Sequence, residues 1–233
     1  MTDMDPASGL TIGALVTPVP ARRPQRISLH GRFVDVVPLD PAEHADGLFE
    51  GIRDREDLWL YLFEGPFFNI HTFEADLERK ATSEDPLYFS VLDRKTGSAQ
   101  GHVAYLRIEP VHRVIEVGAI LYTPKLQRTA GATEAMYLMA KYVFEDLGYR
   151  RYEWKCNALN EPSRRAALRL GFRFEGIFRQ HMIVKGRNRD TAWYAMLDSE
   201  WPARKAAFER WLDPGNFDEQ GRQKQALSEM MPG

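Results

Sequence analysis

A turn of small residues between an expected strand and the longest expected helix places the strongest constraint on the fold. It reads Gln-Arg-Thr-Ala-Gly-Ala-Thr over residues 127–133. Small side chains let a ligand come close to the backbone, and the first N–H groups of a helix have no partner inside the helix. These groups lie at the positive end of the helix dipole, so the turn could bind an anion such as a pyrophosphate. A simpler interpretation, that Gly131 and its alanine neighbours only allow tight packing, is equally consistent with this segment.

Apolar periodicity and turn signals give the order of the elements around this turn. The helix is expected to run from Gly131 to Leu147 and to end at Gly148, a residue type common at helix C-termini. Strands are expected at 32–39, 88–92, 101–108, 114–121, 151–156, 173–184 and 190–197. Other helices are expected within 55–83, on either side of Gly65-Pro66, and at 160–171 and 201–212. This order predicts an α+β sandwich around one mixed, mostly antiparallel sheet.

The 233 residues are enough for one such domain with a tail at each end. Residues 1–25 hold four prolines and few periodic apolar positions. They are therefore expected to form an N-terminal arm, either loose or laid along the domain surface. The domain is expected to cover residues 26–200, and residues 201–233 are expected to form a C-terminal helix and a polar tail.

Composition argues against several classes of function. The formal net charge of -2 and the pI near 6.3 give no electrostatic argument for nucleic-acid binding. No apolar run approaches the roughly 20 residues that span a bilayer, so no membrane partner is expected. Cys156 is the only cysteine, which excludes an intrachain disulfide and fits a reducing compartment, so a cytoplasmic location is expected. The six histidines show no metal-ligand spacing, and no metal is expected.

The helical segment over 55–83 is rich in aromatic residues. Trp59, Tyr61 and Phe67 are candidates for the wall of a substrate pocket, and Tyr105 on the strand at 101–108 is a fourth candidate. The competing interpretation is that this cluster belongs to the hydrophobic core, which is the commoner use of large aromatic side chains.

Several separated motifs follow one another between Glu116 and Trp201. They are Glu116-Val117-Gly118, Gln127-x-x-Ala130-x-Ala132, Asn160-Glu161-Pro162-Ser163, Leu170-Gly171-Phe172, Glu175-Gly176 and Lys185-Gly186-Arg187-Asn188-Arg189-Asp190. In this stretch the chain resembles the GNAT superfamily, specifically the branch containing the ribosomal-protein N-terminal acetyltransferases. The pyrophosphate signature of that family is Gln/Arg-x-x-Gly-x-Gly/Ala, so Ala130 stands here in place of the central glycine. Its N–H stays accessible if its φ is negative, and cofactor binding is expected to survive.

The resemblance implies a three-layer α/β/α sandwich in which two parallel strands splay apart and acetyl-CoA lies between them. By position these are the strands at 116–121 and 151–156, with the thioester near the end of the first. Asn160 is also a good helix cap, and the two roles are compatible. The residues expected to contact the cofactor are Leu121, Tyr122, Gln127, Arg128, Thr129, Ala130, Gly131, Ala132, Thr133, Asn160 and Ser163.

The resemblance also implies direct transfer of the acetyl group to an amine, with Glu116 and Ser163 as candidate catalytic residues. An amine attacks only when neutral, yet α-amino groups titrate near ~8 and lysines near ~10.4, so Glu116 is expected to act as the base. Its alternative role is an ion pair with Arg113 or Arg151. Ser163 is expected near the cofactor sulfur, where it could protonate the leaving thiolate. Cys156 has no histidine nearby in the sequence and is expected to be a buried residue rather than a nucleophile.

Three functions remain open at this point. The leading one is an N-acetyltransferase that acts on the amine of a small molecule or an aminoacyl-type metabolite, because the aromatic segment suggests a closed pocket. A protein N-terminus is the alternative acceptor, which the branch resemblance suggests. Ala130 is the one feature that favours a non-catalytic CoA-binding module. The protein is expected to be a monomer or a homodimer.

Overall fold

An eight-stranded sheet organises the protein, whose computed structural model describes residues 2–232. The strand order is β3-β4-β5-β6-β7-β8-β10-β9. All neighbouring strands are antiparallel except β7 and β8, which are parallel and confirm the predicted mixed sheet. The bounds are β3 Leu29–His30, β4 Val34–Pro38, β5 Leu87–Asp93, β6 Ala99–Glu109, β7 Val114–Tyr122, β8 Arg151–Asn157, β9 Arg173–Val184 and β10 Arg187–Leu197.

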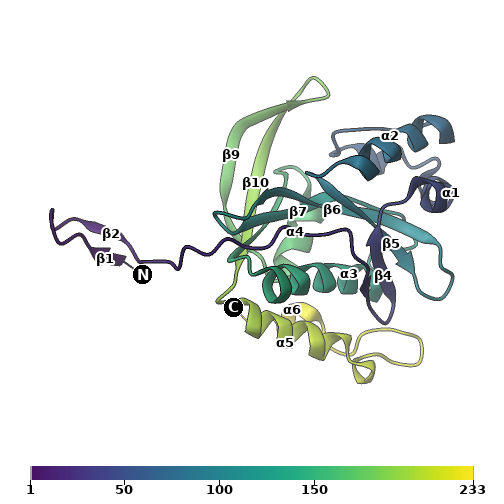
Figure 1. The fold of residues 1–233 in the computed structure, drawn as a ribbon. Helices are drawn as coiled ribbons and strands as arrows, with labels where there is room; N and C mark the ends of the chain where they lie inside the picture. The colour runs from purple at the N-terminus through teal and green to yellow at the C-terminus, as the bar shows by residue number, and fades with distance from the viewer. Residues whose placement is uncertain (1, 233) are drawn as a thin grey trace.

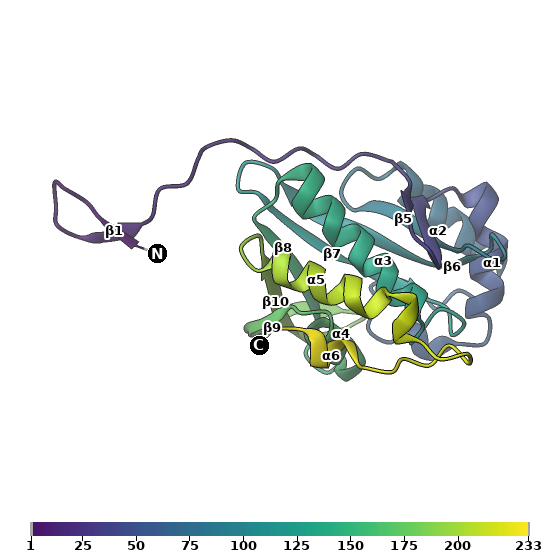
Figure 2. The same ribbon diagram turned by 90° about the horizontal axis from the view of Figure 1, so that it is seen from below.

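Helices cover both faces of this sheet (Figure 1). One face carries α1 (Pro41–Ile52), the short helix η1 (Glu56–Trp59) and α2 (Ile70–Thr82), and we call it the α1/α2 face. The other, the α3 face, carries α3 (Ala130–Lys141), α4 (Glu161–Arg169) and α5 (Trp201–Leu212), with α3 and α5 side by side (Figure 2). Two short helices follow α5, η3 (Pro214–Asn216) and α6 (Leu227–Met230). Among the described residues, no helix combines the length and apolar character needed to cross a membrane.

Alternation along the strands sorts side chains between two hydrophobic clusters. On β6, Val103 and Tyr105 belong to the cluster under α3, whereas Ala104 belongs to the cluster under α1 and α2. On β7, Ile115 and Val117 likewise face α3. Both faces of the central strands are therefore buried, which is what a three-layer sandwich requires.

The predicted long helix changes character before it ends. Regular α-helix stops at Lys141 and continues as a wider π-helical turn, η2 (Tyr142–Leu147). Gly148 then adopts φ 78°, a left-handed conformation that glycine tolerates without steric cost, and the predicted stop is confirmed. The predicted C-terminal helix is confirmed as α5, and its Trp201, Phe208 and Trp211 lie in the same core cluster as the sheet.

The N-terminal arm projects from the body (Figures 1 and 2). It ends in a small antiparallel hairpin, β1 (Thr2–Met4) and β2 (Thr11–Gly13), which the sequence did not predict. The chain joins the body at Ala21 and Arg22, whose N–H groups donate to the carbonyls of Pro110 and Leu147. The segment that precedes β3 is therefore partly attached to the domain.

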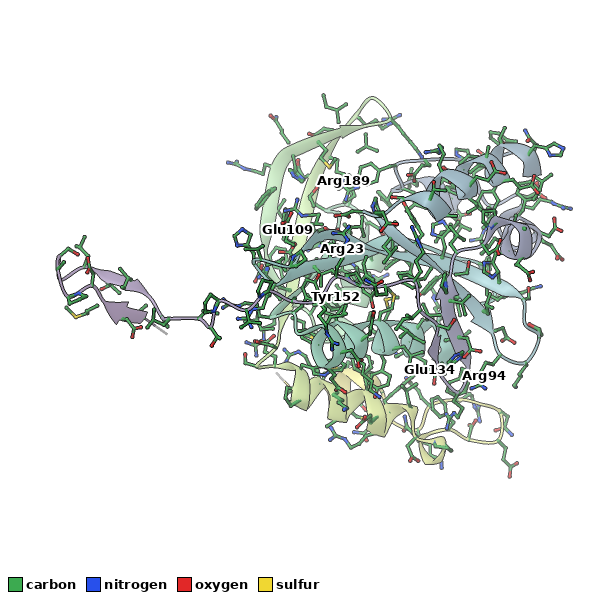
Figure 3. All side chains as sticks on the ribbon, viewed as in Figure 1. Arg23, Arg94, Glu109, Glu134, Tyr152 and Arg189 are labelled. Carbon is green, nitrogen blue, oxygen red and sulfur yellow. The ribbon has the colours of Figure 1, made fainter. Side chains whose placement is uncertain are left out.

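Glu134 ties α3 to the first strands of the sheet. Its carboxylate is buried and accepts hydrogen bonds from the N–H groups of Arg32, Phe33 and Val34 at 2.6–3.0 Å. Gly31 lies so close that an added Cβ would be 2.4 Å from Glu134 Oε2. Figure 3 labels Glu134 near Arg94, which donates to the carbonyl of Gly31 in the same turn.

We expect Glu134→Gln to lower the free energy of unfolding by about 3 kcal/mol, because an amide cannot accept three N–H donors and leaves buried groups unsatisfied. Urea denaturation measures this change. Glu50→Gln, on the exposed side of α1, is the matched control and should change stability by less than about 0.5 kcal/mol. Equal effects of the two substitutions would contradict the role assigned to Glu134.

Candidate active site

The parallel strands β7 and β8 pair over only part of their length. Their register runs from Val114 with Arg151 to Val117 with Trp154. Beyond that point β7 continues to Tyr122 and β8 to Asn157 without pairing with each other. We call this place the strand divergence. It leaves backbone N–H and C=O groups on the facing edges available to another partner.

A β-bulge lies on β7 at the divergence. Ala119 and Ile120 oppose the single residue Val103 of β6, and Ala119 adopts φ 49°. A bulge bends its strand and increases the local twist. The left-handed conformation is costly for alanine, and such strained positions are frequent at functional sites.

The ladder between β6 and β7 determines which backbone groups face the divergence. Thr123 N–H donates to the carbonyl of Gln100, so these two residues form a hydrogen-bonded pair. In an antiparallel ladder such pairs alternate with non-bonded ones. Tyr122, opposite Gly101, is therefore a non-bonded position whose N–H points away from β6, whereas the backbone of Leu121 faces β6. Of the two predicted thioester contacts, Tyr122 is the one whose N–H faces the divergence.

The turn of small residues begins α3 beside this strand end. Thr129 caps the helix by accepting the N–H of Ala132 at 3.2 Å, and within the described residues the N–H groups of Ala130 and Gly131 have no acceptor. Arg128 is exposed and adopts φ 62°. These N–H groups and the helix dipole create a site suited to a pyrophosphate.

Helix α4 begins at the end of β8. Asn160 caps it by accepting the N–H of Ser163 at 3.1 Å, so the predicted cap is confirmed. Ser163 Oγ accepts the indole N–H of Trp154 at 3.0 Å. An indole N–H only donates, so the serine hydroxyl still has its own proton to donate, and the Cys156 sulfur is a neighbouring acceptor for it.

Glu116 lies on the α1/α2 face beside the divergence. Its side chain is 9% exposed, and Oε2 is 2.8 Å from Lys155 Nζ, which also contacts Glu153 at 2.6 Å. Arg107 is a more distant partner at 3.9 Å. Glu116 Oε1 lies 3.4 Å from the Cβ position of Gly118, so the carboxylate leans along β7 toward the divergence. The predicted ion-pair partners, Arg113 and Arg151, are not the ones observed.

The surroundings drive the pKa values of the two carboxylates in opposite directions. Burial raises the pKa of Glu116, although the ammonium of Lys155 opposes this shift. Burial also tends to raise the pKa of Glu153, but hydrogen bonds from Lys155 and Arg151 outweigh it and leave that pKa below the ordinary value. A carboxylate with a raised pKa is the better proton acceptor, so Glu116 is the candidate general base of the pair.

Comparison with known proteins identifies the family. Residues 35–173 match the model of the acetyltransferase (GNAT) domain. This chain belongs to the GNAT family. A crystal structure of a GCN5-related N-acetyltransferase from Brucella melitensis shares 50% sequence identity with it, with a TM-score of 0.90 over 91% of this chain and 97% of that chain.

Two curated proteins of Bacillus subtilis (strain 168) are also similar. The uncharacterized N-acetyltransferase YnaD is 31% identical over 48% of this chain and 65% of its own length. YdaF, provisionally named a ribosomal N-acetyltransferase, is 29% identical over 72% of this chain and 92% of its own length. The alignment thus spans just under two thirds of YnaD and most of YdaF.

The residues predicted to contact CoA in this GNAT domain divide into two groups. Gln127, Arg128 and Thr129 are exposed and form the rim of the turn. Gly131 and Thr133 are buried. A Cβ on Gly131 would lie 2.7 Å from Val34, and the Thr133 hydroxyl accepts a hydrogen bond from Arg169. The packing interpretation therefore holds for the side-chain positions of these two residues, while the N–H of Gly131 remains without a partner among the described residues.

The predicted substrate residues do not form one wall. Tyr105 is fully buried under α3, and its hydroxyl donates to the carbonyl of Met139, so its assignment as a substrate contact is wrong in this structure. Trp59 is 2% exposed and packs against Phe67 around a cavity of only about 70 Å³. Tyr61 is partly exposed and donates to the carbonyl of Leu159. The aromatic segment is thus chiefly core, because its rings cluster on each other.

Cys156 is buried, and burial raises the pKa of its thiol, which disfavours the nucleophilic thiolate. Among residues 2–232, no group of three or more histidine, cysteine, aspartate or glutamate side chains is arranged to hold a metal ion.

Sequence reasoning missed Lys155 and Trp193. Lys155 Nζ lies 3.9 Å above the ring of Trp193, which stacks on Phe178 at 4.5 Å. The position of Lys155 in the sequence could have indicated its role. Parallel pairing sets Glu116 beside Glu153, and a cation two residues along the strand is on the same face as both carboxylates.

We expect Lys155→Met to raise the pKa of Glu116 further, because the substitution removes the ammonium that stabilises the ionised carboxylate. Titration of the labelled glutamate carboxyl carbons by NMR measures this shift. Arg107→Met is the matched control and should shift the pKa less, since that guanidinium is more distant and its side chain is 60% exposed. A larger shift in the Arg107 variant would contradict the assignment.

Proposed function

We propose that this protein is an N-acetyltransferase that transfers the acetyl group of acetyl-CoA directly to the amine of a small molecule or an aminoacyl-type metabolite. One juxtaposition supports this proposal above all. The strand divergence has the start of α3, with the unpaired N–H groups of Ala130 and Gly131, at one end and the carboxylate of Glu116 on the α1/α2 face. Donor and acceptor would therefore meet from opposite faces of the sheet.

The residues fit the cofactor. The N–H groups of Ala130 and Gly131, with Arg128 at the rim, would hold its pyrophosphate. Acetyl-CoA, when bound, supplies an acetyl thioester. The N–H of Tyr122 would donate a hydrogen bond to the thioester carbonyl, a type of contact worth a few kcal/mol in enzymes. Glu116 would take the proton of the amine, and Ser163 would give one to the sulfur.

The acceptor side is bounded by the β9–β10 hairpin and the aromatic loop after η1. Lys185 at the hairpin turn donates to the carbonyls of Trp59 and Glu64, both at 2.8 Å. This bridge connects the hairpin turn to the loop after η1 on the α1/α2 side, which favours a small acceptor over a long peptide. A protein N-terminus is the second candidate, favoured by the name of YdaF and by the branch resemblance.

CoA at about 100 times its Kd should stabilise the protein by about 2.7 kcal/mol and raise Tm by about 5–10 °C. Arg128→Glu combined with Ala130→Glu should abolish this shift, because two carboxylates would occupy the anion site. Thermal denaturation with and without CoA measures it. Lys95→Glu, in the exposed turn between β5 and β6, is the control. It also replaces a positive by a negative side chain, and it should leave the CoA-induced rise in Tm intact. Retained binding in the double variant would show that the turn is only structural.

Glu116→Gln should lower the acetylation rate by about 100-fold, as expected for loss of a general base. The loss should be greatest at the acid end of the range in which Glu116 is ionised, since the neutral fraction of the amine is smallest there. Release of CoA thiol as a function of pH measures it, with the exposed Glu109→Gln as control. An unchanged pH–rate profile would eliminate Glu116 as the base. CoA binding without thiol release from acetyl-CoA for any amine would identify a non-catalytic CoA-binding module.

A further inference from the structure

Arg189 on β10 is a buried cation whose outer nitrogens have no partner. The residue is 7% exposed. Its Nε donates to Thr191 Oγ1 at 3.3 Å, and its guanidinium carbon lies 4.8 Å from the centre of the Phe63 ring. In the described part of the chain, no carboxylate and no other acceptor contacts Nη1 or Nη2. Figure 3 labels this side chain between the β9–β10 hairpin and the helical side of the molecule.

This arrangement is unusual for a buried arginine. Charged side chains are seldom buried unless they are paired, because removing a charge from water is costly. Arg204, which is 3% exposed, follows this rule: Nε donates to the carbonyl of Gly171, and Nη2 lies 3.6 Å from Glu200 Oε1. Arg189 is also buried, at 7% exposed, but it has no anion beside it. The difference points to an anion supplied from outside the chain.

The location of Arg189 relates it to the candidate active site. Residues 189, 191 and 193 of β10 follow the alternation that brings Trp193 against Lys155, on the α1/α2 face. Arg189 lies opposite Met182 of β9, near the turn of the hairpin. Burial lowers the pKa of Arg189, and the charge of Glu116 is close enough to oppose that shift.

We propose that Arg189 binds a carboxylate of the acceptor, so that the substrate is a small molecule carrying both the reactive amine and a free carboxylate, such as an amino acid. The proposal rests on the proposed N-acetyltransferase function. A guanidinium offers two parallel N–H donors that match the two oxygens of a carboxylate. The stack on Phe63 and the bond to Thr191 leave these outer donors free and orient the plane.

Charge favours a carboxylate over a phosphate. One guanidinium balances one negative charge, and a phosphate monoester carries nearly two at neutral pH. Two other cations lie on this face: Lys155 is already engaged by Glu116 and Glu153, and Arg107 lies 3.9 Å from Glu116. A peptide N-terminus would present an amide at the position where an amino acid presents its carboxylate, so it would not satisfy Arg189.

The test compares acceptors that differ only in this group. The common L-amino acids are offered as free acids and as carboxamides, with thiol release measured for the natural protein, Arg189→Met and Arg189→Lys. Arg187→Met, an exposed arginine on the same strand, is the matched control. For at least one free acid, Arg189→Met should lower kcat/KM by about 100-fold, mainly by raising KM. For the corresponding carboxamide, the same substitution should lower kcat/KM by less than about threefold. The kcat/KM of Arg189→Lys for the free acid should lie between those of the natural protein and Arg189→Met, since lysine keeps the charge but lacks the paired donors.

A second measurement does not depend on turnover. The N-acetylated amino acid should raise the Tm of the CoA-saturated natural protein, and its methyl ester should not. In Arg189→Met this shift should disappear, while the shift caused by CoA alone should remain, which also shows that the variant is folded.

Three results would overturn the proposal. An equal loss of kcat/KM for the free acid and the carboxamide in Arg189→Met would show that Arg189 only stabilises the hairpin. Turnover of simple amines or capped peptides, with every free amino acid inactive, would disprove the carboxylate site and leave the proposed N-acetyltransferase function standing. No thiol release with any amine would disprove that function and this inference with it.

Discussion

The incomplete pairing of β7 with β8 is the constraint on which the rest of the site depends. Two parallel strands that remained paired would use all their facing N–H and C=O groups on each other. Here pairing ends at Val117 and Trp154, and the bulge at Ala119 turns the end of β7 away. Helix α3 begins after the free end of β7, and α4 begins after the free end of β8. Backbone geometry thus leaves free N–H groups at this place, which the proposed function assigns to a thioester and a pyrophosphate.

The charged side chains on the α1/α2 face make the two carboxylates of that site differ in pKa. Two carboxylates on adjacent strands would repel each other if both were ionised without a cation between them. Lys155 contacts both, and Arg151 adds to Glu153 alone, so the two groups titrate differently. The residue with the raised pKa, Glu116, is the one that leans toward the divergence. In the proposed mechanism, the neighbouring side chains rather than the residue type therefore distinguish the carboxylate that accepts the proton.

The β9–β10 hairpin completes the acceptor side from a distant part of the sequence. Its strands extend beyond the body and its turn returns to the loop after η1 through Lys185 (Figure 1). The guanidinium of Arg189 from the hairpin lies over the ring of Phe63 from that loop. In the proposed function these two segments would contact the acceptor, and neither belongs to the turn over residues 127–133.

Local signals in the sequence determined much of the fold. The turn of small residues, the Asn160 cap, Gly148 as a helix end and the bounds of α5 were all predicted, because each depends on a few neighbouring residues. The proposed cofactor role of Tyr122 and of the turn over residues 127–133 came instead from the family resemblance. Only the tertiary structure decided that Tyr105 and Trp59 are core, that Lys155 rather than Arg113 or Arg151 pairs with Glu116, and that Arg189 is buried without an anion. These outcomes depend on strand register and on which face a side chain occupies, and a shift of one residue in register reverses that face.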